Sequence, residues 1–109
     1  MIFGIGTDIT SVERFRRARE GVFERILSEK DKEYLEKFKE KSEHVAGFWA
    51  AKEALVKALN RKDLEFRDIS ILHDENGKPF FSFEPEKGNI HLSISHEKEY
   101  AVAFVVWSD

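Results

Sequence analysis

The longest periodic run of apolar positions in the chain lies between Ser42 and Asn60 and predicts one long helix. Its apolar side chains recur at intervals of three and four residues, which is the spacing of a single helix face. Ser42 is the expected N-cap of this helix. The same face includes position 52, where a lysine interrupts the apolar stripe. The apolar positions are Val45, Phe48, Trp49, Leu55, Val56 and Leu59.

The chain opens with a short apolar run. Residues 1–8 contain two glycines and end on Asp8, a pattern that predicts a strand followed by a turn. The glycines allow the backbone to approach a neighbouring element closely. Asp8 itself has two interpretations. It is either a cap for the next turn or helix, as aspartate often is, or a carboxylate at the mouth of a loop.

Shorter helices are expected between this strand and the long helix. A first helix runs to Arg19, with Thr10 or Ser11 as its cap, and Gly21 interrupts it. Residues 22–38 predict helix in one or two pieces. Two residues are candidate starting points for the second piece: Ser28 and Asp31.

After Lys62 the apolar pattern changes from helical spacing to alternation, which predicts strands. The sequence Asn76-Gly77-Lys78-Pro79 is a turn signal between the first two of them. We therefore expect one α+β domain over residues 1–109, in which an N-terminal strand and helices precede an antiparallel sheet packed on the long central helix. The later strands are expected around residues 69–71, 80–83, 90–94 and 100–107.

Composition narrows the class of protein. The chain has 109 residues, of which 41% are hydrophobic and 36% charged, as in a soluble globular domain. It has no cysteine, which excludes disulfides and thiolate metal sites. Its net charge of -3 disfavours a general nucleic-acid binder. No signal peptide and no bilayer-spanning run of about 20 apolar residues is present, so we expect a cytoplasmic protein without a membrane partner.

Three charged residues on the long helix are the main candidates for chemistry. Glu53 and Lys57 are four residues apart, and an exposed helix ion pair worth about 0.3–0.5 kcal/mol is the simplest interpretation. Lys52 lies on the apolar stripe, so its ammonium must either reach the surface or find an anion. The alternation of positive, negative and positive charge suits a magnesium-bridged polyphosphate.

Arginines are concentrated just after the first strand. Four of them fall within eight residues that contain a single acid, Glu13. This cluster is either a solvated helix face or a surface that receives an acidic partner. Its members are Arg14, Arg16, Arg17 and Arg19.

A polar group lies at the end of the third expected strand of the C-terminal part. Strand alternation places Ser93 and Ser95 on one face with His91, opposite the apolar residues. A solvent-facing polar row is the simplest interpretation. A Ser95–His96 dyad for acyl transfer is a poor alternative, because adjacent strand residues point to opposite faces.

Four short motifs follow one another along the chain: Gly4-Ile5-Gly6-Thr7-Asp8-Ile9, Phe48-Trp49-Ala50-Ala51-Lys52-Glu53-Ala54, Asn76-Gly77-Lys78-Pro79 and Leu92-Ser93-Ile94-Ser95-His96. In this order and at these separations they resemble the holo-acyl-carrier-protein synthase family, and the resemblance covers essentially the whole chain. It implies the phosphopantetheinyl transferase fold. It also implies transfer of 4′-phosphopantetheine from coenzyme A to a serine of apo-acyl carrier protein, with release of adenosine 3′,5′-bisphosphate, in support of fatty acid biosynthesis.

The resemblance implies roles for individual residues. Asp8 and Glu53 would hold Mg²⁺ against the coenzyme A diphosphate. Lys57 matches the family lysine near the transferred phosphate, and Lys52 is an expected phosphate contact. His96 matches the histidine that meets the nucleotide end of the coenzyme. The acceptor of the serine proton stays open between Glu53, Lys57 and a metal-bound water.

Further contacts follow from the same resemblance. Gly77, Lys78 and Pro79 in the turn are expected to bind the coenzyme. Arg14 and Arg17 are expected to receive the acidic helix of the carrier protein. The resemblance to small members of the family also implies a homotrimer with active sites between subunits.

One departure from the family is visible after the long helix. The family commonly has a glycine-rich loop there, whereas this chain has Asn60-Arg61-Lys62-Asp63. We hypothesise that the Arg61 and Lys62 side chains replace the backbone contacts of that loop. Two other classes stay open: a different magnesium-dependent nucleotide enzyme, and a non-catalytic module that binds an acidic protein through the arginine cluster.

Overall fold

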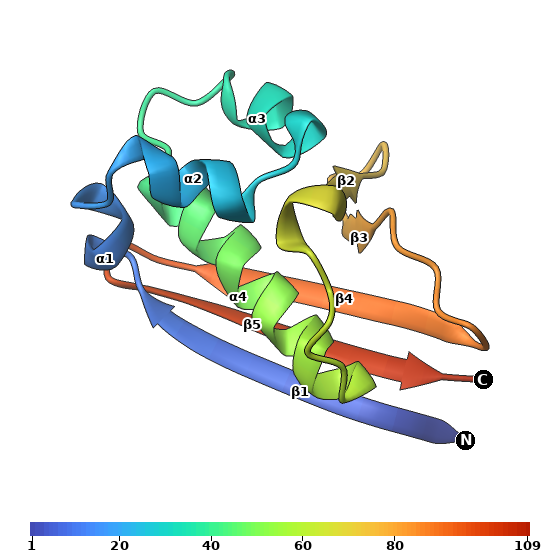
Figure 1. The fold of residues 1–109 in the computed structure, drawn as a ribbon. Helices are drawn as coiled ribbons and strands as arrows, with labels where there is room; N and C mark the ends of the chain where they lie inside the picture. The colour runs from blue at the N-terminus through green and yellow to red at the C-terminus, as the bar shows by residue number, and fades with distance from the viewer.

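A long helix lying across a three-stranded antiparallel sheet forms the centre of the molecule (Figure 1). The computed structural model describes the backbone of residues 1–109 and every side chain except that of Glu20. Helix α4 (Ser42–Leu59) lies diagonally over the sheet, whose strand order is β1-β5-β4. The strands are β1 (Ile2–Ser11), β4 (Asn89–His96) and β5 (Tyr100–Ser108).

Short elements cover the helix on two sides. At one side lie α1 and α2, and at the other the hairpin of β2 and β3 (Figure 1). This hairpin is a separate two-stranded sheet, so the expected antiparallel strands divide into two sheets. The α+β class and the order of elements are confirmed. The short elements are α1 (Glu13–Arg16), α2 (Glu20–Ile26), α3 (Glu29–Leu35), the 3₁₀ turn η1 (Phe66–Asp68), β2 (Ile71–His73) and β3 (Pro79–Phe81).

Strand β1 and helix α4 touch through their backbones. A Cβ added to Gly4 would lie 2.0 Å from the carbonyl oxygen of Ala58, and one added to Gly6 would lie 2.0 Å from that of Ala54. Any side chain at either position would therefore force the helix away from the strand. The two glycines bring the inward-facing residue two positions further along the strand, Asp8, beside the helix.

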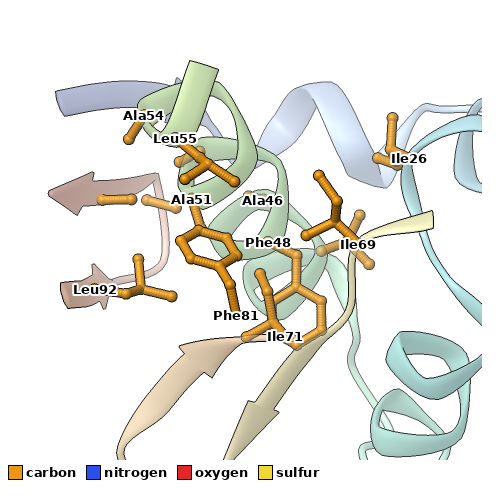
Figure 2. Close-up of a cluster of buried hydrophobic side chains, with 14 of the residues drawn as sticks. Ile26, Ala46, Phe48, Ala51, Ala54, Leu55, Ile69, Ile71, Phe81 and Leu92 are labelled. Atoms are coloured by element: carbon orange, nitrogen blue, oxygen red, sulfur yellow. The ribbon is translucent and has the colours of Figure 1, made fainter. Parts of the chain in front are cut away.

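The main core lies between α4, the sheet and the hairpin (Figure 2). Small residues of α4 allow the close approach to the sheet, and larger side chains fill the space toward the hairpin. The buried side chains labelled in Figure 2 are Ile26, Ala46, Phe48, Ala51, Ala54, Leu55, Ile69, Ile71, Phe81 and Leu92.

The predicted elements between the first strand and the long helix need two corrections. Strand β1 continues to Ser11, so Asp8 lies inside a strand and neither ends it nor caps a turn. The helix expected to reach Arg19 is the single turn α1, and Gly21 lies within α2 and interrupts nothing. Pairing of residues 2–11 with β5 uses the backbone groups that a capped helix would have needed.

Two predicted helix starts have different outcomes. Ser28 begins α3 with a capping box, in which its hydroxyl accepts from the Asp31 N–H at 3.1 Å and the Asp31 carboxylate accepts from the Ser28 N–H at 3.0 Å. Ser42, in contrast, is the first residue of α4 and makes no side-chain cap, because Lys41 before it is already in helical conformation. The helix ends as predicted, with Asn60 in the left-handed region at φ 52°.

Candidate active site

Three predicted site residues meet where β1 passes α4. Asp8 faces the helix, and the Lys57 ammonium lies 3.3 Å from its Oδ1 atom while donating to the Thr7 carbonyl oxygen at 2.9 Å. Glu53 lies one helical turn before Lys57 on the same side of α4. The expected i,i+4 pair of Glu53 with Lys57 does not form in the structure, because Lys57 turns to β1 instead.

The two carboxylates of this cluster repel each other. Burial raises the pKa of Glu53, and the negative charge of Asp8 raises it further. Lys57 and Arg14 act in the opposite direction on the same pKa. Two acceptor-only groups held together in this way form an arrangement that a cation would stabilise. Among the described residues no cluster of three or more histidine, aspartate or glutamate ligands is present, so the chain offers a cation two carboxylates only.

Glu53 borders a cavity of about 650 Å³. Its walls come from α1, α2, α4 and the segment that ends in η1, and most of them are apolar. Arg14 stands at this cavity with its guanidinium carbon 5.0 Å from the centre of the Trp49 ring. Lys62 also lines it. The cavity therefore has mostly apolar walls with charged side chains of both signs among them.

Three of the other predicted coenzyme contacts lie at a second, smaller cavity of about 170 Å³. They are His96, Gly77 and Pro79. The imidazole Nδ1 of His96 lies 2.8 Å from a carboxylate oxygen of Glu43 on α4. Gly77 adopts φ +85° in the turn, and the exposed Lys78 extends from the same turn.

Aromatic rings that the sequence analysis did not select also line this second cavity. His73 stacks on Tyr34 with a centroid distance of 4.0 Å, and His44 stacks on Phe38 at 3.7 Å. Burial is the main cause that lowers the pKa of both imidazoles. No local sequence pattern indicated Tyr34, His44 and His73, because they come from α3, α4 and β2 and meet only in the folded chain.

Within one chain the two groups of predicted residues lie apart. Asp8 is on β1 and His96 on β4, and β5 separates these strands in the sheet. Residues of α1 and α2 line the Glu53 cavity, whereas residues of α3, the hairpin and β4 line the His96 cavity. One subunit alone therefore does not bring the carboxylates and the predicted nucleotide contacts into a single pocket.

The expectation that Lys52 contacts a phosphate is wrong in this structure. Its side chain is 0% exposed and forms an ion pair of 2.6 Å with Asp31, which is equally buried. Its other two hydrogen bonds go to the carbonyl oxygens of Ile26 and Phe66. All three ammonium protons are therefore used inside the protein. The apolar stripe located this lysine correctly but did not reveal that its anion was internal.

The other predicted basic residues do not all lie at the Glu53 cavity. Arg17 is exposed and paired with Glu13 at 2.9 Å, close to Arg14 in the chain. Arg61 pairs with Asp63 at 2.7 Å and borders a different cavity from Glu53. Of the two residues expected to replace the glycine-rich loop, only Lys62 thus reaches the Glu53 cavity, because the Asp63 carboxylate holds Arg61 away from it.

Comparisons with known proteins agree along almost the whole chain. Residues 4–105 match the model of the family described as the 4′-phosphopantetheinyl transferase superfamily. The holo-[acyl-carrier-protein] synthase of Bacillus subtilis (strain 168) is 45% identical over 97% of this chain and 95% of its own length. That of Lactococcus lactis subsp. cremoris (strain SK11) is 43% identical over 97% of each chain.

Solved structures show the same similarity in three dimensions. A crystal structure of a holo-(acyl-carrier-protein) synthase from Bacillus anthracis str. Ames, in complex with CoA (3′,5′-ADP), superposes with a TM-score of 0.91. It is 42% identical, and the match covers 98% of this chain and 96% of that one. The synthase from Neisseria meningitidis gives a TM-score of 0.89 at 32% identity, with both chains fully covered.

Proposed function

Because the chain belongs to the 4′-phosphopantetheinyl transferase superfamily as a holo-acyl-carrier-protein synthase, we propose that Asp8, Glu53 and Lys57 form its transfer site. The reaction moves phosphopantetheine from coenzyme A to a serine of apo-acyl carrier protein and releases adenosine 3′,5′-bisphosphate. The observation that carries this proposal is the meeting of the three side chains at the contact of β1 with α4. A cytoplasmic location and a role in fatty acid biosynthesis belong to the same proposal.

Asp8 and Glu53 fit a magnesium ion. Mg²⁺ is usually held by one or two carboxylates, with water and substrate phosphates filling its other positions. When bound, the ion would neutralise charge on the coenzyme diphosphate. Burial is the main cause that raises the pKa of Glu53, and the charge of Asp8 raises it further, so a cation between the two carboxylates would stabilise their charged forms.

Lys57 completes the transfer site as a positive charge. Its ammonium is held by the Thr7 carbonyl oxygen and the Asp8 carboxylate, and its side chain is 53% exposed. It therefore keeps a free donor directed to solvent, where a phosphate oxygen can accept it. Fixed charge of this kind is the main source of catalysis in phosphoryl-type transfer. The carrier protein supplies the nucleophilic serine, so the chain needs none.

The nucleotide end of coenzyme A fits the second cavity. His96, Gly77 and Pro79 line it, and Lys78 lies in the same turn, as the family resemblance implies. The carrier protein fits the side of α1, because Arg14 and the exposed Arg17 present positive charge beside the cavity of Glu53.

The separation of the two cavities supports a trimer with active sites between subunits. The sheet face turned away from α4 is apolar and exposed, which is typical of a surface covered by another subunit. Adjacent strands build it in register: Ile9 faces Val102, and Phe104 follows on the same face of β5. Its exposed apolar side chains are Ile5, Ile9, Tyr100, Val102 and Phe104.

The intact mass of the carrier protein tests the proposed reaction. We expect apo-acyl carrier protein incubated with this protein, coenzyme A and Mg²⁺ to gain one phosphopantetheine, and the gain to be lost with EDTA or in Asp8→Asn. Binding of coenzyme A without a mass gain on several apo carriers would indicate a different phosphate chemistry. Absence of both activities from the folded protein would indicate a module that only binds an acidic partner.

Mixed oligomers test whether the active sites lie between subunits. Asp8→Asn and His96→Ala each remove one half of the proposed site. After equal amounts are unfolded and refolded together, about a quarter of the sites should contain both intact halves, because each site draws its halves from two subunits. Activity of the mixture well above that of either variant is expected. No recovery in the refolded mixture would show that each chain builds its site alone.

A further inference from the structure

Lys52 is the largest fully buried side chain among those the structure describes, and it is charged. Its ammonium donates to Asp31 Oδ2 at 2.6 Å, to the Ile26 carbonyl oxygen at 2.7 Å and to the Phe66 carbonyl oxygen at 2.8 Å. No buried side-chain nitrogen or oxygen among the described residues lacks a hydrogen-bond partner. The lysine is thus completely satisfied, and it makes no contact with solvent.

The three acceptors come from three elements packed on α4. Ile26 is the last residue of α2, Asp31 lies in the first turn of α3, and Phe66 begins η1. The Asp31 carboxylate also accepts from the Ser28 N–H at 3.0 Å and, through Oδ1, from the Ile71 N–H at 2.8 Å. A single side chain of α4 therefore connects the ends of three covering elements and, through Asp31, the start of β2.

Stability alone does not explain a lysine at this position. A buried ion pair is often no more stabilising than apolar side chains of similar volume, because both charges lose their hydration. An apolar residue at position 52 would still pack in the stripe, but it would hold neither carbonyl oxygen. What the lysine adds is therefore a defined position for the chain at Ile26 and at Phe66.

Both of these chain segments form walls of the Glu53 cavity. Ile26 and Phe66 line it together with Trp49, whose ring meets that of Phe66 edge-on at 5.6 Å between centroids. Glu53 follows Lys52 directly on α4. The lysine thus sets the distance of two walls from the helix that carries the proposed metal ligand, although it does not enter the cavity itself.

We propose that Lys52 is a positioning residue for the transfer reaction, holding the ends of α2 and η1 so that the Glu53 cavity keeps the width that the reacting groups require. This inference rests on the proposed function. It predicts a loss of turnover without a loss of nucleotide binding, because none of the three groups bound by Lys52 lines the His96 cavity. Misplacement of reacting groups by about 1 Å costs about 100-fold in rate.

The test compares Lys52→Met/Asp31→Asn with the wild-type protein. The double variant is used because Lys52→Met alone leaves the Asp31 carboxylate buried without its partner and is prone to misfold. We expect kcat at saturating coenzyme A and carrier protein to fall by about 10-fold to 100-fold. The Kd of adenosine 3′,5′-bisphosphate, measured by calorimetry, is expected to change by less than about 2-fold. Leu92→Ala, a buried change on β4, is the control for lower stability without displaced cavity walls.

A second measurement does not depend on activity. In a Trp107→Phe background Trp49 is the only tryptophan, and it lines the cavity. Acrylamide is expected to quench its fluorescence more strongly in the double variant than in the background protein or in Leu92→Ala. Unchanged quenching, unchanged kcat, or an equal loss of kcat in Leu92→Ala would each overturn the proposal. If the wild-type protein fails to modify any carrier while quenching still increases, the proposed function fails and the placement of the walls by Lys52 stands.

Discussion

The ammonium group of Lys57 reaches from helix α4 to strand β1 and lies 3.3 Å from the carboxylate of Asp8. Because this pair is partly exposed, it contributes only about 0.2–1 kcal/mol to folding. Its proposed importance is that it fixes the positive charge of Lys57 at the transfer site. We expect Lys57→Ala to fold normally and to lose at least about 100-fold in kcat, as is typical when one preorganised electrostatic group is removed. The assay is carrier modification followed by mass. Lys30→Ala, an exposed lysine on α3, is the control, and equal activity of the two variants would contradict the assignment.

The two carboxylates at the transfer site predict a gain in stability on binding magnesium. A ligand that binds only the folded state adds about 2.7 kcal/mol at a concentration 100 times its Kd. The melting temperature of the wild-type protein should therefore rise by several degrees with Mg²⁺. Glu53→Gln removes the repulsion with Asp8, so without metal it should melt at or above the wild-type temperature and should not respond to Mg²⁺. A response of the same size in the variant would place the ion elsewhere.

The backbone contact of β1 with α4 predicts a large effect of one methyl group. Gly6→Ala would place a carbon 2.0 Å from the Ala54 carbonyl oxygen, so we expect it to lower the free energy of unfolding by about 1–3 kcal/mol or more. Gly21→Ala in α2 is the matched control, because nothing lies within 4 Å of the added carbon. That change should stabilise the protein by about 0.5–1 kcal/mol. Urea unfolding of both variants measures the difference.

The buried imidazole of His73 predicts a loss of stability in acid. Burial is the first cause of its lowered pKa and the charge of Lys37 the second, so the unfolded chain binds a proton more readily than the folded one. The contribution is present above the unfolded pKa of 6.5 and is lost as the pH falls through the lower folded value.

Urea unfolding of the wild-type protein between about pH 5 and 8 measures this dependence. One histidine adds a slope of at most about 1.4 kcal/mol per pH unit. His73→Phe should reduce the slope while keeping a ring against Tyr34. An unchanged slope in His73→Phe would refute the assignment.

The exposed sheet face predicts the response of the oligomer to a charge. Ile9 is 64% exposed in the single chain and faces Val102 across the strands. Ile9→Asp should convert a trimer into monomers of 12.7 kDa, because a buried carboxylate without a partner is costly. Light scattering coupled to size exclusion gives the mass. Glu97→Gln in the loop between β4 and β5 is the control, and a wild-type monomer would contradict the proposed assembly.

Local sequence patterns predicted the elements well where periodicity and turn chemistry act within a few residues. The helix expected between Ser42 and Asn60 is found over Ser42–Leu59, and the turn at Asn76-Gly77 joins two strands. The end of the first strand was wrong, because pairing with β5, which lies nearly a chain length away, decides how far β1 extends. The division into two sheets is likewise set by tertiary packing.

The candidate site was predicted in its members but not in their arrangement. The motifs selected Asp8, Glu53 and Lys57, and the structure brings these three together. They also selected Lys52 for a phosphate, whereas its partner is Asp31, twenty-one positions away in the chain. A pattern along one helix shows which face a residue occupies. It does not show which distant carboxylate will be buried against that face.

The direct contact of Gly4 and Gly6 with α4 also has a consequence for motion. No layer of side chains lies between strand and helix at these points. Because there are no side chains there to repack, we expect β1 and α4 to move together as one rigid unit. Local opening is then left to the short helices α1 to α3, each of which has seven residues or fewer. In hydrogen exchange, the amides of β1, β5 and α4 should exchange only on global unfolding, while those of α1 to α3 exchange through smaller fluctuations. The transfer site is thus expected to combine a rigid part with a more mobile one. Its charged residues lie on β1 and α4, and the facing wall of the cavity belongs to α1 and α2.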